Sequence, residues 1–263
     1  MTKVQDILNF LETVAPTYMK MEWDNTGLLC GNPEQSVSKV LVALDPFYGV
    51  CLEAKEVGAD LLLTHHPLIF TPAHSITTET ELGKSILFLA KQNISAVNAH
   101  TNLDCAPGGV NDVLAKELGL NNITVISPSG VDENGQSWGL LRQGTVAKQS
   151  LQDFLRTVKD SLGCAGLRYA DGGKPVCKVA VGGGACGSEL EFAVKAGCDT
   201  FVTADVKYNQ FASAKEMGLN IIDAGHFHTE NPVCTILAQK LQKAFPEITV
   251  VLSQKHADCV NFF

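Results

Sequence analysis

The chain lacks any apolar run of about 18 residues or more, which is the length that a membrane-spanning helix requires. It also lacks a basic and then apolar leader, because Met1 to Phe10 carries Asp6 and other polar residues within an amphipathic pattern. These two absences predict a cytoplasmic protein with no membrane partner.

Closely spaced cysteine pairs are also absent. The nine cysteines are scattered, odd in number and never form a C-x-x-C pair. A disulfide framework or a cysteine-based zinc site would need closer pairing. We therefore expect mostly buried, reduced thiols.

Basic residues are few and do not cluster. The chain has 20 Lys and Arg against 28 Asp and Glu, which gives a net charge of -8. Nucleic-acid binding usually needs a basic face that neutralises phosphates. No nucleic-acid partner is therefore expected.

What the sequence does contain is an alternation of helical and strand-like segments. The apolar fraction is 45%, which is ordinary for a protein with a sizeable core, and 263 residues allow one large domain or two smaller ones. Alternating strands and helices predict a parallel sheet with crossover helices. The segments are a helix over Val4 to Val14, a strand over Val40 to Leu44, a strand over Leu61 to Leu63, a helix over 80–92 and a strand over Ile94 to Val97.

This pattern recurs 139 residues later. Ala-x-x-x-Gly-x-Asp-x-x-x-Thr occurs at 54–64 and again at 193–203, and Lys39 to Val42 matches Lys178 to Val181. Further along, Asn98-Ala99-His100 matches Ala224-Gly225-His226, where the offset is only 126 residues. The first copy therefore holds about 13 extra residues, which we assign to the loop Pro67 to Glu79. Ordered matches of this kind favour two related halves.

The predicted fold is therefore α/β, with two related α/β domains that arose by internal duplication and are each a sheet flanked by helices. The segment Ser127 to Gly135 is rich in Ser, Pro and Gly, which is typical of a domain boundary. We predict that residues 1–126 and 225–263 form the first domain, which carries most metal ligands. Residues 127–224 form the second.

Five of the seven histidines fall in three short segments, each just after a predicted strand. In open α/β sheets, sites form outside the carboxyl ends of strands, so the three segments can converge. The segments are Thr64-His65-His66-Pro67, Ala99-His100-Thr101-Asn102-Leu103-Asp104 and Gly225-His226-Phe227-His228-Thr229-Glu230.

Imidazole nitrogens and carboxylate oxygens suit zinc, iron, manganese and nickel. The three segments offer at least five such ligands, which exceeds the needs of one catalytic ion. Two ions about 3.5–4 Å apart can clamp a substrate oxygen between them. The sequence therefore predicts two divalent metal ions per chain, whose identity it does not determine.

Each segment taken alone has a simpler interpretation. The pair His65 and His66 could form an ordinary surface pair. Asp104 could cap a helix that begins near Gly108, and Glu230 could occupy the first turn of the next helix.

The third segment allows two geometries. His226 and Glu230 are one turn apart on a helix, whereas His226, His228 and Glu230 share one face of an extended segment. The sequence leaves this choice open. His74 and His256 are isolated and receive no role.

Weaker candidates for substrate binding are Asp24, Asp205 and Lys207. Asp24 precedes a glycine turn, where an Asx-turn is the alternative role. Asp205 and Lys207 follow a strand of the second half. The block Gly182 to Gly187 could hold a phosphate at a helix N-terminus, but it lacks the Walker lysine, so a tight strand-to-helix turn is favoured.

Several of these blocks together resemble the Nif-three family, also called the GTP cyclohydrolase I type 2 homologues. The resemblance runs from about residue 5 to the C-terminus. Two specific blocks carry it, His65-His66-Pro67-Leu68-Ile69-Phe70 and Ala99-His100-Thr101-Asn102-Leu103-Asp104. They are accompanied by Trp23-Asp24-Asn25-Thr26-Gly27-Leu28 and Gly225-His226-x-x-Thr229-Glu230.

The resemblance implies a ring-shaped homohexamer with a dimetal site in the cleft between the two domains of each subunit. The family pattern does not use His228, which favours the one-turn geometry. One departure is Asn209, where relatives carry a histidine. Position by position, the implied metal ligands are His65, His66, Asp104, His226 and Glu230.

The resemblance also implies a metal-dependent hydrolase, similar to GTP cyclohydrolase, that acts on a small molecule through metal-bound water. In this hypothesis Asp104 or Glu230 bridges the metals, and His100 orients a ligand or carries a proton. The alternative is a metal-binding regulator or protein-interaction factor without turnover.

Overall fold

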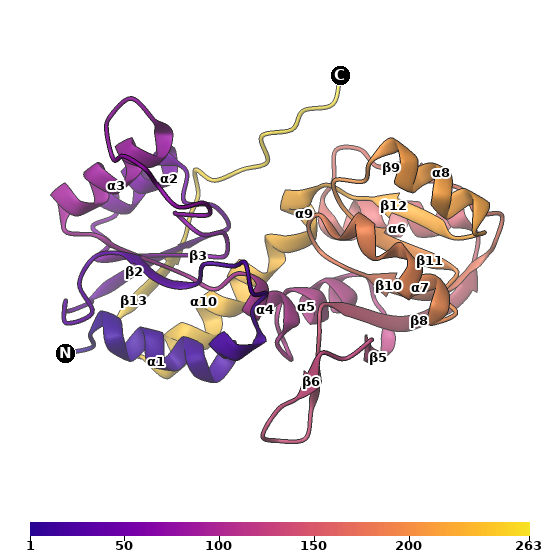
Figure 1. The fold of residues 1–263 in the computed structure, drawn as a ribbon, viewed down its shortest axis with the longest axis horizontal. Coiled ribbons are helices and arrows are strands. Elements are labelled where there is room, and N and C mark those ends of the chain that lie inside the picture. The colour runs from indigo at the N-terminus through magenta and orange to yellow at the C-terminus, as the bar shows by residue number, and fades with distance from the viewer. The chain divides into compact units, whose positions relative to one another are not determined.

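The chain forms two compact α/β units in the computed structural model, which describes residues 1–263. Unit 1 contains Met1–Leu103 and Val233–Ala257, and unit 2 contains Asp104–Pro232 and Asp258–Phe263 (Figure 1). Each unit has its own sheet and its own flanking helices.

Unit 1 is built on a five-stranded sheet with the order β1-β4-β3-β2-β13. Neighbours among β4, β3, β2 and β13 are parallel, and β1 runs antiparallel to β4 at one edge. The strands are β1 (Gly27–Cys30), β2 (Lys39–Ala43), β3 (Leu61–Thr64), β4 (Ser95–Asn98) and β13 (Thr249–Leu252).

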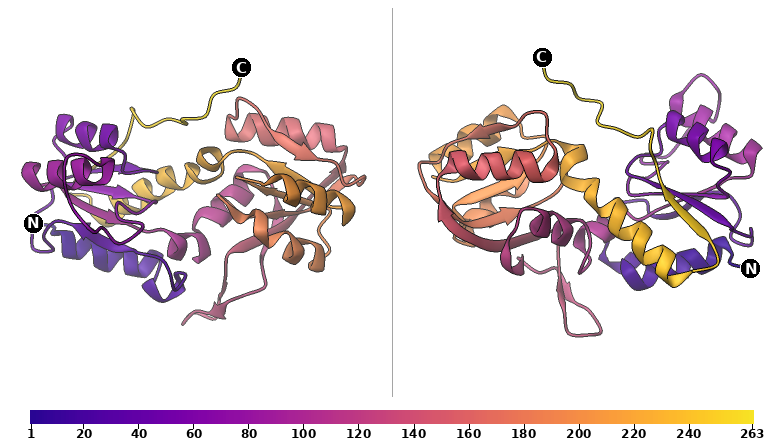
Figure 2. Two further views of the ribbon diagram at one scale, coloured as in Figure 1. Left: turned by 45° about the horizontal axis from the view of Figure 1, so that its top comes forward. Right: turned by 180° about the vertical axis from the view of Figure 1, so that it is seen from behind.

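Helices cover both faces of this sheet. On one face, α2 (Tyr48–Glu56) and α3 (Glu81–Gln92) pack Cys51, Ala54 and Leu89 against strand residues such as Leu41 and Leu62. On the other face lie α1 (Val4–Val14), followed by the short helix η1 (Thr17–Met19), and α10 (Pro232–Ala244), as Figures 1 and 2 show from several sides. Two-sided coverage explains the continuous apolar character of the central strands.

Unit 2 is built on a six-stranded sheet with the order β5-β8-β10-β11-β12-β9. Here β10, β11 and β12 are parallel, and the remaining pairs are antiparallel. The strands are β5 (Asn121–Ile126), β8 (Leu141–Gln149), β9 (Arg168–Ala170), β10 (Val176–Val181), β11 (Thr200–Thr203) and β12 (Asn220–Asp223), with a separate hairpin of β6 (Gly130–Val131) and β7 (Ser137–Trp138).

The second sheet is also covered on both faces. On one face, helices α5 (Val110–Glu117) and α6 (Leu151–Leu162) contribute Leu114, Phe154 and Val158 to an apolar cluster. This cluster also contains Val179 and Ile222 of the sheet. Residues of α7 and α8 share another cluster with Phe201 on the opposite face. The helices of unit 2 are α4 (Thr101–Cys105, which begins at the end of unit 1), α5 (Val110–Glu117), α6 (Leu151–Leu162), η2 (Cys186–Glu189), α7 (Leu190–Lys195), α8 (Tyr208–Glu216) and α9 (His226–Glu230).

The predicted duplication is visible in the hydrogen bonds. Asp60 accepts from the backbone N–H groups of Ser38 and Lys39, and Asp199 accepts from those of Cys177 and Lys178. The side chains of Lys39 and Lys178 donate to the carbonyl groups of Val57 and Ala196, which end the equivalent helices α2 and α7. Equivalent residues thus make the same contacts in both units, which confirms the prediction of two related α/β halves.

The two copies differ where the sequence predicted an insertion. Residues 65–80 connect β3 to α3 in unit 1, whereas residues 204–207 connect β11 to α8 in unit 2. Residues 71–80 of the longer loop are exposed. The extra length therefore lies in this loop.

The boundaries of the units differ from the predicted ones. Residues 104–126, 225–232 and 258–263 belong to unit 2, whereas the sequence pattern assigns them to the first domain. The reason is that β5 pairs with β8, α5 packs against the same strand and α9 packs against α5, while Asp258 contacts His228 of α9.

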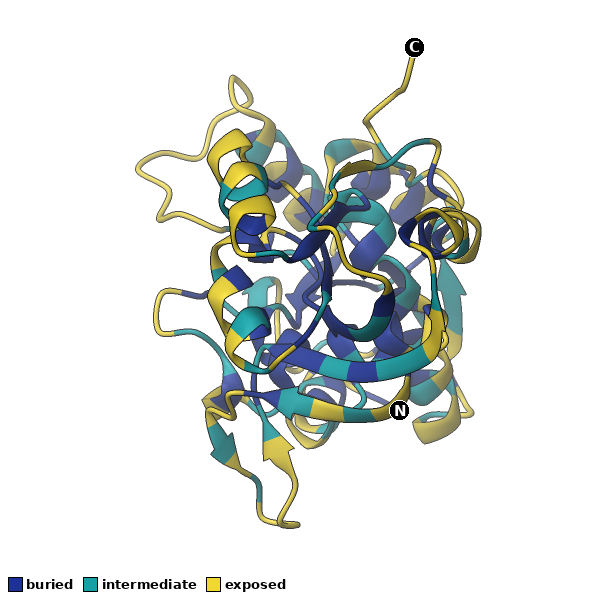
Figure 3. Cartoon of the chain, turned by 90° about the vertical axis from the view of Figure 1, so that its right-hand side faces the viewer, coloured by how far each residue is buried: buried dark blue, intermediate teal, exposed yellow.

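Burial follows the layers, with dark central strands and exposed outer helix faces in Figure 3. Six of the nine cysteines are buried, Cys30 and Cys177 are half-buried and Cys259 is exposed. Burial raises the pKa of Cys51 and Cys198 to about 11, so these thiols are protonated and inert near neutral pH. None of the helices has the length and apolar character needed to cross a membrane.

Candidate metal centre

Three histidines gather at the carboxyl ends of β3 and β4 in unit 1. His65 and His66 follow β3 directly, and His100 follows β4. Their ring centroids are 4.9 Å (His65–His66), 5.2 Å (His65–His100) and 5.5 Å (His66–His100) apart. One ring nitrogen from each lies within 4.8 Å of the other two, so this group could hold a metal ion.

All three rings are oriented in the same way by hydrogen bonds. In each case the Nδ1–H group donates to an oxygen that carries no proton of its own, which leaves Nε2 as the unprotonated nitrogen. This tautomer is the one that metal-binding histidines usually adopt. The acceptors are the carbonyl oxygen of Ala99 for His65 (2.8 Å), Oδ1 of Asp45 for His66 (2.7 Å) and Oδ1 of Asp24 for His100 (2.7 Å).

Asp24 is buried and its contacts are internal. Oδ1 accepts from His100 and from the backbone N–H of Asn25, and Oδ2 accepts from Thr101. Burial by itself raises the pKa of Asp24, but the hydrogen bonds from His100 and Thr101 outweigh it and hold the pKa at about 2. The sequence suggested that Asp24 binds substrate or forms an Asx-turn. Its side chain instead contacts His100, Thr101 and the N–H of the adjacent Asn25, and so it orients His100.

A pH-dependent contribution to stability follows from Asp24. Its folded pKa of about 2 lies below the value of about 3.9 in an unfolded chain, so the ionised form stabilises the fold by about 2 kcal/mol. This stability is fully present above about pH 4–5 and is lost as the pH falls through about 2. Urea unfolding would give the free energy of unfolding of metal-free wild type and of Asp24→Asn. The difference between the two values is expected to be constant from about pH 5 to 7 and smaller near pH 3. A difference that stays constant down to pH 3 would contradict the assignment.

Asp45 was not predicted from the sequence. Its Oδ1 binds His66, and its Oδ2 lies 2.9 Å from Nε2 of His256. Burial by itself raises the pKa of Asp45, but the hydrogen bonds from the two imidazoles hold it well below its usual range. Asp45 stands right after a buried strand, a position that could have identified it, whereas no spacing in the sequence points to His256.

Two exposed aromatic rings stand beside His100. Trp23 is 62% exposed and Phe70 is 56% exposed. The two rings meet edge to face with centroids 5.7 Å apart, and each centroid lies 6.1 Å from that of His100. Exposed rings of this kind can stack on a planar ligand next to the histidines.

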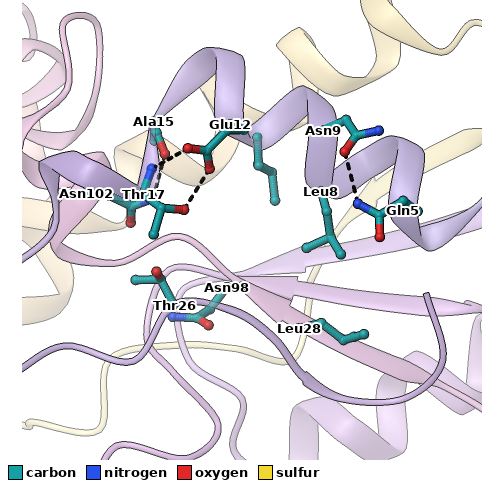
Figure 4. A pocket seen from close by; sticks show the side chains of 12 residues that line it. Gln5, Leu8, Asn9, Glu12, Ala15, Thr17, Thr26, Leu28, Asn98 and Asn102 are labelled. Carbon is teal, nitrogen blue, oxygen red and sulfur yellow. Dashed lines mark hydrogen bonds between the residues drawn. The ribbon is translucent and has the colours of Figure 1, made fainter.

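A separate pocket of about 310 Å³ lies between α1 and the edge strand β1 (Figure 4). Leu8 of α1 and Leu28 of β1 line it, together with Asn and Gln side chains. Its one carboxylate, Glu12, accepts from the backbone and the hydroxyl of Thr17, and no histidine lines the pocket. Its chemistry therefore does not suit a metal ion.

In unit 2, His226 and Glu230 stand one turn apart on α9. Nε2 of His226 lies 3.0 Å from Oε2 of Glu230, and Nδ1 of His226 lies 2.7 Å from Oδ2 of Asp205. The helix confirms the one-turn geometry over the extended one. Asp205, a predicted substrate-binding residue, orients His226, while the predicted Lys207 is exposed just before α8.

His228 points to other partners. Its Nδ1–H donates to the carbonyl oxygen of Leu162 over 3.1 Å, and its Nε2 lies 3.1 Å from Oδ2 of Asp258. Both ring nitrogens are therefore engaged in structural contacts, which agrees with the family pattern.

The glycine block forms a tight turn between β10 and η2, and it leaves room for Glu230. A Cβ atom at Gly184 would lie 2.1 Å from Oε1 of Glu230 and 3.1 Å from Nε2 of His226. The φ angle of Gly184 is +62°, a conformation that favours glycine. Both the backbone conformation and the neighbouring side chains therefore require glycine at position 184. The block forms the tight strand-to-helix turn that the sequence favoured.

Asp104 is buried at the end of α4, and it does not cap α5, whose N-cap is Gly109. Asn111 holds its segment by donating to the carbonyl oxygen of Asp104 and accepting from the N–H of Gly183. The buried Arg142 donates to the carbonyl groups of Cys105 and Ala106.

The buried carboxylates of Asp104 and Glu230 both affect the pKa of the Cys186 thiol. Burial is the main reason that the pKa of Cys186 is raised well above its usual value, and the charges of Asp104 and Glu230 raise it further. Asp104, Glu230 and Cys186 therefore lie in one region of unit 2, close to the glycine turn.

The chain matches one protein family over nearly its whole length. The sequence profile described as Duf34/NIF3 (NGG1p interacting factor 3) matches residues 2–258. A protein of Clostridium perfringens named "GTP cyclohydrolase 1 type 2 homolog" is 38% identical over 99% of both chains. A protein of the same name from Methanocaldococcus jannaschii is 32% identical over 87% of this chain and 90% of its own length.

Solved structures agree with this match. A Bacillus cereus protein described as related to NIF3 has a TM-score of 0.94 and 27% identity, and the match covers 100% of this chain and 99% of that one. A Methanocaldococcus jannaschii protein described as reduced HcgD has a TM-score of 0.76 and 29% identity over 96% of this chain and 98% of that one.

Proposed function

The chain belongs to the Duf34/NIF3 family, and from this premise we propose that it is a dinuclear metal-binding protein that hydrolyses a small molecule. The single observation that carries the proposal is the histidine group of unit 1, where one ring nitrogen from each of His65, His66 and His100 lies within 4.8 Å of the other two.

The donor set fits divalent metal ions. The proposed ligands are neutral imidazoles and carboxylates, which suit zinc, iron, manganese and nickel. When bound, such ions supply Lewis-acid activation of water and substrate oxygen. As the family resemblance implies, the proposed ligands are His65, His66, Asp104, His226 and Glu230.

The residues around these ligands support a hydrolytic role. His100, oriented by Asp24, is placed to hold or move a proton at Nε2. The exposed faces of Trp23 and Phe70 next to it favour a substrate with a planar ring. Relatives named as GTP cyclohydrolase homologues are consistent with a purine-like ring, although the chain offers no Lys and Arg cluster for a triphosphate.

We expect about two metal ions per chain, because five ligands exceed the needs of one site. Protein purified without chelator, and protein reloaded with zinc, manganese or iron, would be measured by elemental analysis. A reproducible stoichiometry of zero after reloading would refute the metal site.

Turnover is tested by screening metal-loaded protein against nucleotides, phosphoesters and amides, with Glu230→Gln as the inactive control. Hydrolysis that survives complete metal removal would rule out the proposed mechanism. Full metal occupancy without turnover of any substrate would favour the alternative function, a metal-binding regulator or interaction factor.

We also propose that the chain assembles as a toroidal homohexamer, which rests on the family resemblance. The expected mass in solution is six times the monomer mass of 28.1 kDa. Light scattering at micromolar concentration measures this mass directly, and a monomer mass would contradict the assembly.

A further inference from the structure

Asp45 connects the proposed metal ligand His66 to a second imidazole near the C-terminus. One carboxylate oxygen accepts from Nδ1 of His66 over 2.7 Å, and the other lies 2.9 Å from Nε2 of His256. The side chain of His256 is only 4% exposed, and those of Asp45 and His66 are 17% and 18% exposed. Water therefore has little access to His256.

The segment that carries His256 is itself fixed by several contacts. The buried side chain of Glu53, on α2, accepts from the hydroxyl of Ser253 and from the backbone N–H of Gln254. The hydroxyl oxygen of Ser253 accepts from the backbone N–H of His256 over 3.1 Å. The ring of His256 also packs against Phe47, with centroids 5.9 Å apart and planes tilted by 30°. These contacts define both the position and the plane of the imidazole.

We infer that His256 is a positioning residue for the metal ligand His66 and that it acts through Asp45. A carboxylate that accepts the Nδ1–H of a ligand histidine fixes the tautomer and the direction of Nε2. Asp45 can do this only if its own rotation is restricted, and the contact of its second oxygen with His256 supplies that restriction. The inference rests on the proposed metal site, because it assigns Nε2 of His66 to a metal.

The role differs from that of an ordinary buried ion pair. In the other two histidines of the group, Nδ1–H donates to the Ala99 carbonyl (His65) or to Asp24 (His100), and the second oxygen of Asp24 is held by the neighbouring Thr101. His66 instead depends on a residue 190 positions later in the chain, reached through Asp45. The direction of this ligand is thus set by the C-terminal segment.

The test compares wild type with His256→Ala, His256→Gln and His256→Leu. Glutamine retains an N–H donor, whereas leucine fills the volume without one. Lys255→Ala is the matched control, because Lys255 lies in the same segment and pairs only with the exposed Glu56 side chain. Three quantities are measured: zinc affinity by chelator competition, the absorption spectrum of the Co²⁺-loaded protein, and the Asp45–His66 distance in crystals of the metal-free protein.

Loss of an orienting partner typically weakens metal binding by about 10–100-fold. We expect this loss, an altered Co²⁺ spectrum and a longer Asp45–His66 distance for His256→Ala and His256→Leu. His256→Gln is expected to restore most of the affinity, and Lys255→Ala to leave all three quantities unchanged. If His256→Ala does not fold, His256→Leu carries the comparison.

Wild-type affinity, spectrum and distance in both the Ala and Leu variants would overturn the inference. Equal losses in the Gln, Ala and Leu variants would also overturn it, because the effect would then come from packing. If wild type bound no metal, the proposed function would fail, yet the crystallographic distance in the metal-free variants would still decide whether His256 positions His66.

Discussion

Glu230→Gln is expected to weaken metal binding by more than about 100-fold, beyond the effect of losing an orienting partner. The substitution keeps the shape of the side chain but replaces an anionic oxygen donor by a neutral amide. Glu230 is 4% exposed, so no water-filled space lets another anion take its place. In the proposed site, a bound metal would therefore lose both a ligand and the nearby negative charge.

The measurement is the rise in thermal midpoint when metal is added to metal-free protein. A 100-fold weaker Kd removes about 2.7 kcal/mol of stabilisation at a fixed metal concentration. Glu216→Gln is the control, because Glu216 is exposed at the end of α8. If the two variants respond equally to metal, Glu230 is not a ligand.

Gly184→Ala is expected to damage the same site from the backbone side. A methyl group there would lie 2.1 Å from Oε1 of Glu230, which forces the buried carboxylate away from its position beside His226. The positive φ adds a cost of about 1 kcal/mol or more for any residue with a Cβ atom. Both stability and metal affinity should therefore fall.

Gly197→Ala separates the two causes. Gly197 has a φ of +74°, similar to the +62° of Gly184, but a Cβ atom there would meet nothing within 4 Å. Urea unfolding should show the backbone cost in both variants and an additional loss only in Gly184→Ala, together with weaker zinc binding. Equal stability losses and wild-type metal affinity in Gly184→Ala would show that Glu230 moves aside without consequence.

Local patterns in the sequence were sufficient for the central parallel strands of each half, but not for the antiparallel strands β1, β5, β8 and β9. Strand and helix periodicity identified β2, β3 and β4. The offset of 139 residues identified the counterparts of β2 and β3 in unit 2, and the smaller offset of 126 residues identified that of β4. Such patterns are informative because each strand buries its own side chains wherever it lies in the fold. The placement of His65, His66 and His100 at strand ends followed from the same reasoning, since the carboxyl ends of parallel strands share one edge.

The sequence also determined that His226 and Glu230 could face each other, because four residues make about one turn of helix. It did not determine that the segment is helical, since an extended segment with His228 was equally consistent with the spacing. The contacts of His228 with Leu162 and Asp258 in unit 2 decided this point, and both partners are distant in the chain.

Only the tertiary structure revealed what orients the histidines. The carboxylates that orient His66, His100 and His226 are those of Asp45, Asp24 and Asp205, which lie 21, 76 and 21 residues away in the sequence. His256 lies 211 residues from Asp45. The extents of the two units were likewise decided by the pairing of β5 with β8, which no local pattern encodes. The physical reason is the same in each case: periodicity reports which face of an element is buried, whereas the partner of a polar group is chosen by packing between segments that are far apart in sequence.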